Sequence, residues 1–339
     1  MNHPPRAVIF GCAGPELSDR ERRFFADADP LGFILFQRNC VEPVQVRRLI
    51  GALRESVGRA DAPVLIDQEG GRVMRLKPPH WRAAPAQARF AELAERDADG
   101  AREAAYLNAR LLAAELAELG ISVDCAPVLD LRVPGAHEII GDRALGAEPR
   151  RVVELGRAVA QGLLDGGILP VIKHIPGHGR AAVDSHVELP VVDVPRDVLE
   201  RTDFEPFRRL AAMPWGMTAH VVYRAIDPDL PASLSARVIE EVIRGSIGFA
   251  GFLVSDDVTM KALRGDVGAL LRSAVQAGCD AALHCNGDIR EMERVARETP
   301  RLAAAAIERL ARASAALPKQ RPALNLSAAL GRIETLLAA

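Results

Sequence analysis

The segment from residue 173 to residue 186 holds the densest group of side chains that can exchange protons. It begins Lys-His-Ile-Pro-Gly-His-Gly and ends Asp-Ser-His. Three histidines and an aspartate can bind a metal ion, but His174 and His178 would share one face only in a helix. Pro176 and the two glycines disfavour a helix here. We therefore expect no metal and no other cofactor, with a metal site as the alternative.

Asp184 and His186 lie two residues apart at the end of this segment. A carboxylate that accepts a hydrogen bond from one imidazole nitrogen orients the ring and raises its pKa, so the other nitrogen exchanges protons near neutral pH. The two residues are therefore a candidate acid/base pair. The alternative is that His186 is an ordinary histidine of a surface loop.

Other polar residues stand where apolar runs end. Asp67 begins Asp-Gln-Glu-Gly-Gly-Arg directly after one run, Asp130 and His220 follow two others, and Asp256 follows a fourth. Catalytic groups of a (β/α)8 barrel lie at the carboxyl ends of its strands. Isolated surface charges would not gather at these points, so we predict that these side chains line one site.

Eight apolar runs alternate with helical patterns along the chain, as in parallel strands joined by crossover helices. The runs are residues 7–10, 32–36, 64–66, 123–126, 169–173, 217–219, 252–255 and 281–284. They predict a single-domain (β/α)8 TIM-type barrel over residues 1–339, with a helical tail over about 301–339. An open doubly wound sheet shows the same alternation, but the Gly-Cys-Ala-Gly sequence at residues 11–14 lacks the remaining glycines of a phosphate-binding fingerprint.

The connecting stretches carry helix signals and one long insertion. Amphipathic patterns predict helices over residues 44–59, 101–119, 151–165, 234–247 and 261–277, with Ser18 and Ser235 as start signals. Residues 74–99 form an insertion after the third strand. A long loop at this end of a barrel is usually functional.

Composition and charge narrow the classes of partner. Hydrophobic residues make up 49% of the 339 residues, and 43 basic against 45 acidic residues leave a formal net charge of -2. This charge does not attract a polyanion. Apolar stretches are too short for a membrane span or a signal peptide, and the five cysteines form no Cys-x-x-Cys pair. We therefore predict a cytoplasmic protein with no nucleic-acid or membrane partner, and we expect a monomer.

The polar motifs resemble those of the glycoside hydrolase family 3 β-N-acetylhexosaminidases over nearly the whole chain. The likeness rests on Leu-Phe-Gln-Arg-Asn at 35–39, Asp-Gln-Glu-Gly-Gly-Arg-Val at 67–73, Ile-Gly-Asp-Arg at 140–143, the segment 173–186, and Ser-Asp-Asp at 255–257 followed by Met260. The long pattern from Lys-His to Asp-Ser-His is typical of the N-acetylglucosaminidase branch.

This resemblance implies a retaining glycosidase that removes terminal β-linked N-acetylglucosamine from saccharide or muropeptide substrates, such as N-acetylglucosaminyl-anhydro-N-acetylmuramyl peptides of peptidoglycan. It implies that Asp256 is the nucleophile, His186 the general acid/base and Asp184 the partner of His186. The implied sugar contacts are Asp67, Arg75, Arg143, Lys173 and His174. A phosphorylase that intercepts the same covalent intermediate and a non-catalytic sugar-binding barrel are the alternatives.

Overall fold

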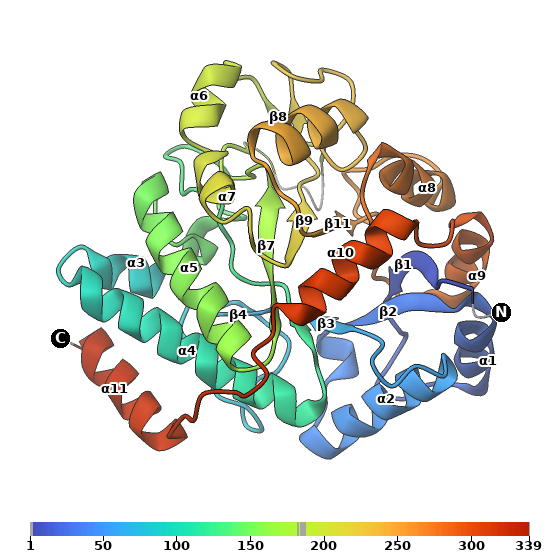
Figure 1. Cartoon of the computed structure of the whole chain (residues 1–339), viewed down its shortest axis with the longest axis horizontal. Helices are drawn as coiled ribbons and strands as arrows, with labels where there is room; N and C mark the ends of the chain where they lie inside the picture. Colours follow the sequence, from blue (N-terminus) through green and yellow to red (C-terminus); the bar gives the residue numbers. More distant parts are fainter. Residues whose placement is uncertain (1–2, 182, 184–187, 339) are drawn as a thin grey trace.

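A computed structural model of the chain describes residues 3–181, 183 and 188–338. Within these residues, eight parallel strands close into a barrel in which neighbours follow the order β1, β12, β11, β9, β7, β6, β3, β2 (Figure 1). The strands are β1 (Arg6–Phe10), β2 (Pro30–Leu35), β3 (Val64–Ile66), β6 (Val123–Asp124), β7 (Leu169–Ile175), β9 (Trp215–Thr218), β11 (Phe252–Asp257) and β12 (Ala281–His284). Each strand overlaps one predicted apolar run. The predicted (β/α)8 barrel is confirmed, and the open sheet is excluded.

Side chains fill the barrel interior. Ile9, Leu65, Val171 and Trp215 belong to one buried cluster with inward-facing residues of the other strands. Because every second residue of a strand points inward, apolar residues from all eight strands meet along the axis and form a packed core. Leu302, just before α10 (Ala304–Ala315), joins this cluster, and Figure 1 shows α10 crossing in front of the strands. The interior is therefore a packed core and offers no pore.

Helices surround the strands and bury the second face of the sheet. They are α1 (Asp19–Ala28), α2 (Pro43–Ser56), α4 (Ala98–Leu119), α5 (Pro149–Asp165), α6 (Arg196–Arg201), α7 (Glu205–Arg209), the π-helix η3 (Val238–Ser246), α8 (Val267–Ala277) and α9 (Ile289–Glu298). Ser18 caps the start of α1, as predicted: its side chain accepts a hydrogen bond from the Glu21 backbone N–H. In the tail, α11 (Leu326–Ala338) packs on α4 through Ile333 and Leu111 (Figure 1).

The prediction of a helix from residue 261 was wrong at its start. Residues 261–266 form turns and bends, and α8 begins at Val267. Gly265 has a φ of +131°, which a helix does not contain, and the Asp266 side chain accepts a hydrogen bond from the Ala269 N–H as the cap. The polypeptide that follows β11 is therefore a loop at the carboxyl end of the barrel.

Short extra elements decorate the described part of that end. The hairpin of β4 (Gln68–Gly70) and β5 (Val73–Met74) follows β3, and α3 (Ala88–Ala94) lies within the predicted insertion. Two 3-10 turns, η1 (Gln37–Asn39) and η2 (Gly141–Arg143), and the pair β8 (Val191–Val192) with β10 (Val222–Tyr223) complete the set. These segments follow strand ends, so they shape whatever site lies there.

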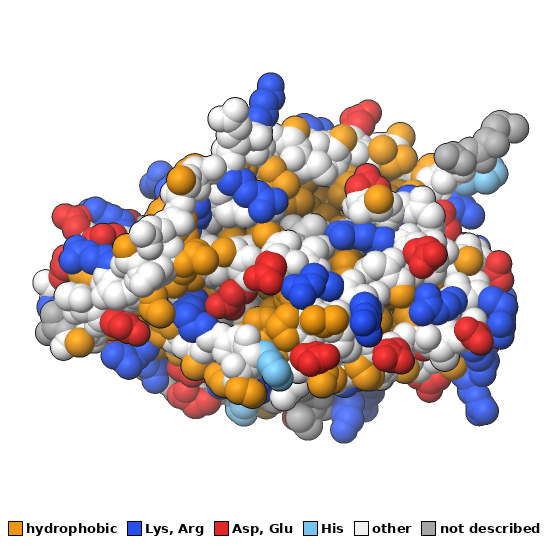
Figure 2. Space-filling view, turned by 90° about the horizontal axis from the view of Figure 1, so that it is seen from below, with side chains coloured by type: hydrophobic (Ala, Val, Ile, Leu, Met, Phe, Trp, Pro, Cys, Tyr) orange, Lys and Arg blue, Asp and Glu red, His pale blue; other side chains and the backbone are white. Residues whose placement is uncertain are grey.

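The surface is mixed in charge where it can be seen. Figure 2 shows Lys and Arg side chains interspersed with Asp and Glu on the face it views, without a continuous basic stripe. None of the described helices is long and apolar enough to cross a membrane.

Candidate active site

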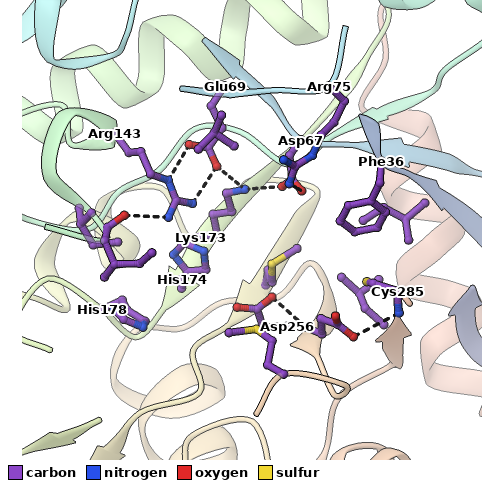
Figure 3. Close-up of a pocket in the computed structure, with 18 of the residues that line it drawn as sticks. Phe36, Asp67, Glu69, Arg75, Arg143, Lys173, His174, His178, Asp256 and Cys285 are labelled. Atoms are coloured by element: carbon purple, nitrogen blue, oxygen red, sulfur yellow. Dashed lines mark hydrogen bonds and ion pairs between the residues drawn. The ribbon is translucent and has the colours of Figure 1, made fainter. Parts of the chain in front are cut away.

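A pocket of about 290 Å³ lies at the carboxyl ends of the barrel strands (Figure 3). It brings together six predicted site residues from five separate segments of the chain: Asp67, Arg75, Arg143, Lys173, His174 and Asp256. Asp130 and His220, which were predicted to line the same site, lie behind it and contact the lining residues His174 and Asp257. The predicted acid/base His186 and its partner Asp184 lie outside the described residues. The pocket is also lined by Phe36, Glu69, His178 and Cys285, for which the sequence predicted no sugar contact.

Lys173 is the charged centre of one wall. It projects from β7 and is 2% exposed, with its Nζ 2.7 Å from Asp67 Oδ1 and 2.6 Å from Glu69 Oε1. Burial alone would raise the pKa of Asp67, but Lys173 and Arg75 hold it well below its usual range. Burial would likewise lower the pKa of Lys173, and the two carboxylates raise it instead. These groups therefore stay ionised at neutral pH.

Arg75 extends this wall toward the rim. Its Nη2 donates to Asp67 Oδ2 at 2.9 Å, and its guanidinium lies 5.2 Å from the centroid of the Phe36 ring. A cation at this distance is attracted to the face of an aromatic ring. Asp67 is thus held from both sides, by Lys173 and by Arg75, and its carboxylate has a fixed orientation.

Glu69 links this wall to Arg143. The Arg143 Nε and Nη2 donate to the two oxygens of Glu69, each at 2.8 Å. Burial opposes ionisation of Glu69, but Arg143 and Lys173 lower its pKa. Arg143 Nη1 also donates to the Ile139 carbonyl at 3.2 Å, so the guanidinium is held in one orientation. Sequence reasoning missed this partner, although its position in the Asp-Gln-Glu motif was the available signal.

Asp130 orients the two histidines of the predicted loop. It is fully buried, with Oδ2 2.6 Å from His174 Nδ1, and its Oδ1 accepts the His178 N–H at 2.7 Å. Burial would raise the pKa of Asp130, yet His174 lowers it, so the carboxylate accepts and His174 Nδ1 carries the proton. The contact with Asp130 fixes the orientation of the His174 ring, which lines the pocket. Asp130 was recognised at a strand end but was given no partner.

Asp256 stands at the end of β11, across the pocket from Lys173 (Figure 3). Its Oδ1 accepts the Asp257 N–H at 2.8 Å. Burial would raise the pKa of Asp256, but His220 and His174 hold it below its usual value, so it is an anion at neutral pH. A buried, ionised and lightly hydrogen-bonded carboxylate is suited to nucleophilic attack.

The neighbouring Asp257 is engaged elsewhere. Its oxygens accept hydrogen bonds from the Thr259 N–H at 3.0 Å, the Thr259 hydroxyl at 2.7 Å and the Cys285 N–H at 3.2 Å. Its backbone carbonyl accepts a hydrogen bond from His220 Nε2 at 3.0 Å, while His220 Nδ1 lies 2.6 Å from Ser233 Oγ. Asp257 and His220 therefore hold the strand end in place, and Asp256 is left to face the pocket.

The histidines of the described residues do not form a metal centre with their neighbours. No group of three or more His, Cys, Asp or Glu side chains in residues 3–181, 183 and 188–338 has a geometry that could hold a metal ion. His174 uses Nδ1 for Asp130, as an orienting contact.

Known proteins share both the sequence pattern and the architecture. The glycosyl hydrolase family 3 N-terminal domain matches residues 13–313. A beta-hexosaminidase from Alkalilimnicola ehrlichii is 42% identical over 283 residues, or 82% of this chain and 80% of that protein. One from Xanthomonas campestris is 36% identical over 336 residues, or 96% of this chain and 99% of that protein.

A solved structure agrees over the full length. NagZ from Neisseria gonorrhoeae in complex with N-trifluoroacetyl-D-glucosamine has a TM-score of 0.89 and 31% identity, covering 99% of each chain. NagZ from the same organism in complex with zinc ion has a TM-score of 0.88 and 30% identity, again over 99% of each chain. The chain therefore belongs to glycosyl hydrolase family 3, and its predicted resemblance to the β-N-acetylhexosaminidases of that family is confirmed.

Proposed function

We propose that this chain, a glycosidase of the β-N-acetylhexosaminidase type, is a retaining enzyme that removes terminal β-linked N-acetylglucosamine from peptidoglycan fragments. The observation that carries the proposal is the ionised Asp256, which faces a wall of fixed donors across a pocket large enough for one sugar ring. The binding of N-trifluoroacetyl-D-glucosamine by the similar NagZ supports the choice of sugar.

In the first step, an Asp256 oxygen attacks the anomeric carbon while His186 protonates the leaving oxygen, so the glycosidic bond breaks and a glycosyl ester forms. In the second step, His186 takes a proton from water, whose oxygen attacks the anomeric carbon from the face that the leaving group vacated and displaces Asp256. Two displacements at one carbon restore its configuration. Asp184 would orient the His186 ring, as the sequence suggested.

The fixed wall supplies orientation. Asp67 can accept hydrogen bonds from sugar hydroxyls, Lys173 and Arg143 can donate them, and the His174 ring can form a hydrogen bond through Nε2. Because their partners already hold these groups, little side-chain entropy is lost when the sugar binds. The pocket therefore favours one ring orientation, with the anomeric carbon toward Asp256.

The rim supports an anionic leaving group. Arg38 and Lys77 are exposed beside Phe36, which lines the pocket: the Arg38 guanidinium lies 4.9 Å from the Phe36 ring centroid, and Lys77 Nζ donates to Gln37 Oε1. When the sugar occupies the pocket, the carboxylates of an attached muramyl peptide would lie at the rim, near these cations. All five cysteines are free, which fits a reducing cytoplasm, and we propose that the enzyme acts there as a monomer.

The test compares three substrates on the purified chain. We expect rapid hydrolysis of an aryl N-acetylglucosaminide and of an N-acetylglucosaminyl-anhydromuramyl peptide, and slow hydrolysis of the matching aryl glucoside. Comparable rates on the two aryl glycosides would contradict the assignment of the sugar. Release of a sugar phosphate when phosphate is present would instead identify a phosphorylase, and retention is read from the anomer first seen by NMR.

A further inference from the structure

Gln68 lies between two site residues, Asp67 and Glu69, but points away from the pocket. Its side chain is fully buried, and all of its hydrogen bonds go to one short stretch of backbone. The Oε1 atom accepts the N–H groups of Arg75 at 2.9 Å and Leu76 at 3.1 Å, and Nε2 donates to the Leu76 carbonyl at 3.0 Å. One amide thus holds the backbone on which Arg75 is carried.

We call Gln68 a clamp because it ties two segments together, and its own backbone is anchored in the barrel. The Gln68 N–H donates to Asp124 Oδ1 at 3.0 Å, and Asp124 belongs to β6 and is fully buried. The strands that connect Gln68 to Arg75 are short: β4 and β5 have only two registered pairs, with a shift between them. Backbone pairing alone therefore leaves the register of Arg75 weakly specified.

The clamp explains how Arg75 reaches Asp67. Asp67 directly precedes Gln68, and the Arg75 guanidinium pairs with Asp67 Oδ2. The Arg75 side chain is still about a quarter exposed, so without a fixed backbone it would sample other rotamers in water. A residue that fixes both backbones also fixes the distance between them.

We propose that Gln68 is a positioning residue for substrate binding: it sets the backbone of Arg75 in register with Asp67, so that the two side chains are paired before the sugar arrives. This inference rests on the proposed function, in which Asp67 and Arg75 contact the substrate. Without the clamp, substrate must order Arg75 itself, and the cost appears in binding. Arg75 lies on the wall away from Asp256. Its disorder should therefore weaken binding of the ground state and of the transition state by the same free energy.

The test replaces Gln68 by methionine, which has similar length and makes none of the three side-chain hydrogen bonds. We expect KM for an aryl N-acetylglucosaminide to rise about tenfold, equivalent to about 1.4 kcal/mol, while kcat changes less than about twofold. The matched control is Gln87→Met. Gln87 is a buried glutamine of the insertion that also carries Arg75, and its amide atoms have no partner among the described residues, so KM should be unchanged.

A double-mutant cycle separates positioning from general destabilisation. If Gln68 acts through Arg75, Gln68→Met raises KM less than about twofold in an Arg75→Ala background. The same tenfold rise in both backgrounds would overturn the proposal. Hydrogen exchange gives a readout that does not depend on the substrate: the amides of Arg75 and Leu76 should exchange faster in Gln68→Met, and unchanged exchange would also overturn it.

If Gln68→Met lacks a cooperative unfolding transition, the same cycle is run with Gln68→Glu. A carboxylate keeps the acceptor for both N–H groups but cannot donate to the Leu76 carbonyl. The protonated carboxyl group can donate, so the KM of Gln68→Glu should approach that of the wild type as pH falls. A ratio of the two KM values that stays raised at every pH would refute the clamp. Failure of the wild type to cleave the substrate would instead refute the proposed function, whereas normal wild-type turnover with an unaltered Gln68→Met refutes positioning alone.

Discussion

Replacement of Glu69 by glutamine tests the charge network of the wall that we propose binds the sugar. Glu69 is 3% exposed and meets three cationic donors: Arg143 Nε and Nη2, both at 2.8 Å, and Lys173 Nζ at 2.6 Å. Glutamine keeps one acceptor oxygen and turns an NH2 group toward a cation. Removing one partner of a buried ion pair costs about 3–5 kcal/mol. Lys173 keeps its ion pair with Asp67, so Arg143 is the cation that loses its charged partner. We therefore expect the free energy of unfolding to fall by about 3 kcal/mol.

The assay is urea unfolding at pH 7, with Glu293→Gln as the control. Glu293 also forms a bidentate pair, with Arg20 at 3.0 and 2.9 Å, but on the surface. Exposed pairs contribute about 0–1 kcal/mol, so the control should unfold near the wild type. An equal, small loss in free energy of unfolding for the two variants would refute the role assigned to burial. We also expect kcat/KM of Glu69→Gln to fall at least about tenfold, because Arg143 loses its fixed orientation.

The pH dependence of the same experiment has a defined sign. The pKa of Glu69 is lower in the folded protein than the unfolded value of about 4.3, so its ionisation stabilises the fold above that pH. This contribution disappears as pH falls through the folded pKa. The difference between wild type and Glu69→Gln should therefore be full at pH 7 and shrink below about pH 4. A difference that grows in acid would show that the carboxylate is not stabilised by its partners.

The remaining predictions concern catalysis. Asp256→Ala should reduce turnover to background even for an aryl glycoside with an excellent leaving group, and a slowed fluoro-sugar should label Asp256 in peptide mass mapping; a label on Asp257 or Asp67 would identify a different nucleophile. His186→Ala should slow a natural disaccharide far more than a dinitrophenyl glycoside, which leaves without protonation, and azide should restore turnover; equal losses on both substrates would argue against an acid/base role. EDTA should leave activity unchanged, since the proposed steps use only a carboxylate and an imidazole; loss that zinc reverses would restore the metal alternative.

Sequence reasoning predicted several residues that line this pocket, because strand ends can be recognised in a sequence. Asp67, Lys173 and Asp256 each stand at the end of an apolar run, and parallel strands of a closed barrel bring such ends together. Arg75 is different. It lies beyond the hairpin that follows β3, and only the family resemblance suggested it, because no local pattern shows that Gln68 folds it back onto Asp67.

The apolar runs by themselves indicated parallel strands covered by helices, because a strand that is buried on both faces consists of consecutive apolar residues. An open sheet has the same runs, and closure into a barrel is seen only in the structure. Pairings were decided only by tertiary structure. Arg143 meets Glu69 across 74 residues, and Lys173 meets Asp67 across 106. Which carboxylate each cation selects depends on the closure of the barrel and on hydrogen bonds to buried backbone, and so does the ionisation of each group. Those distances are set when distant strands become neighbours, and no sequence spacing contains them.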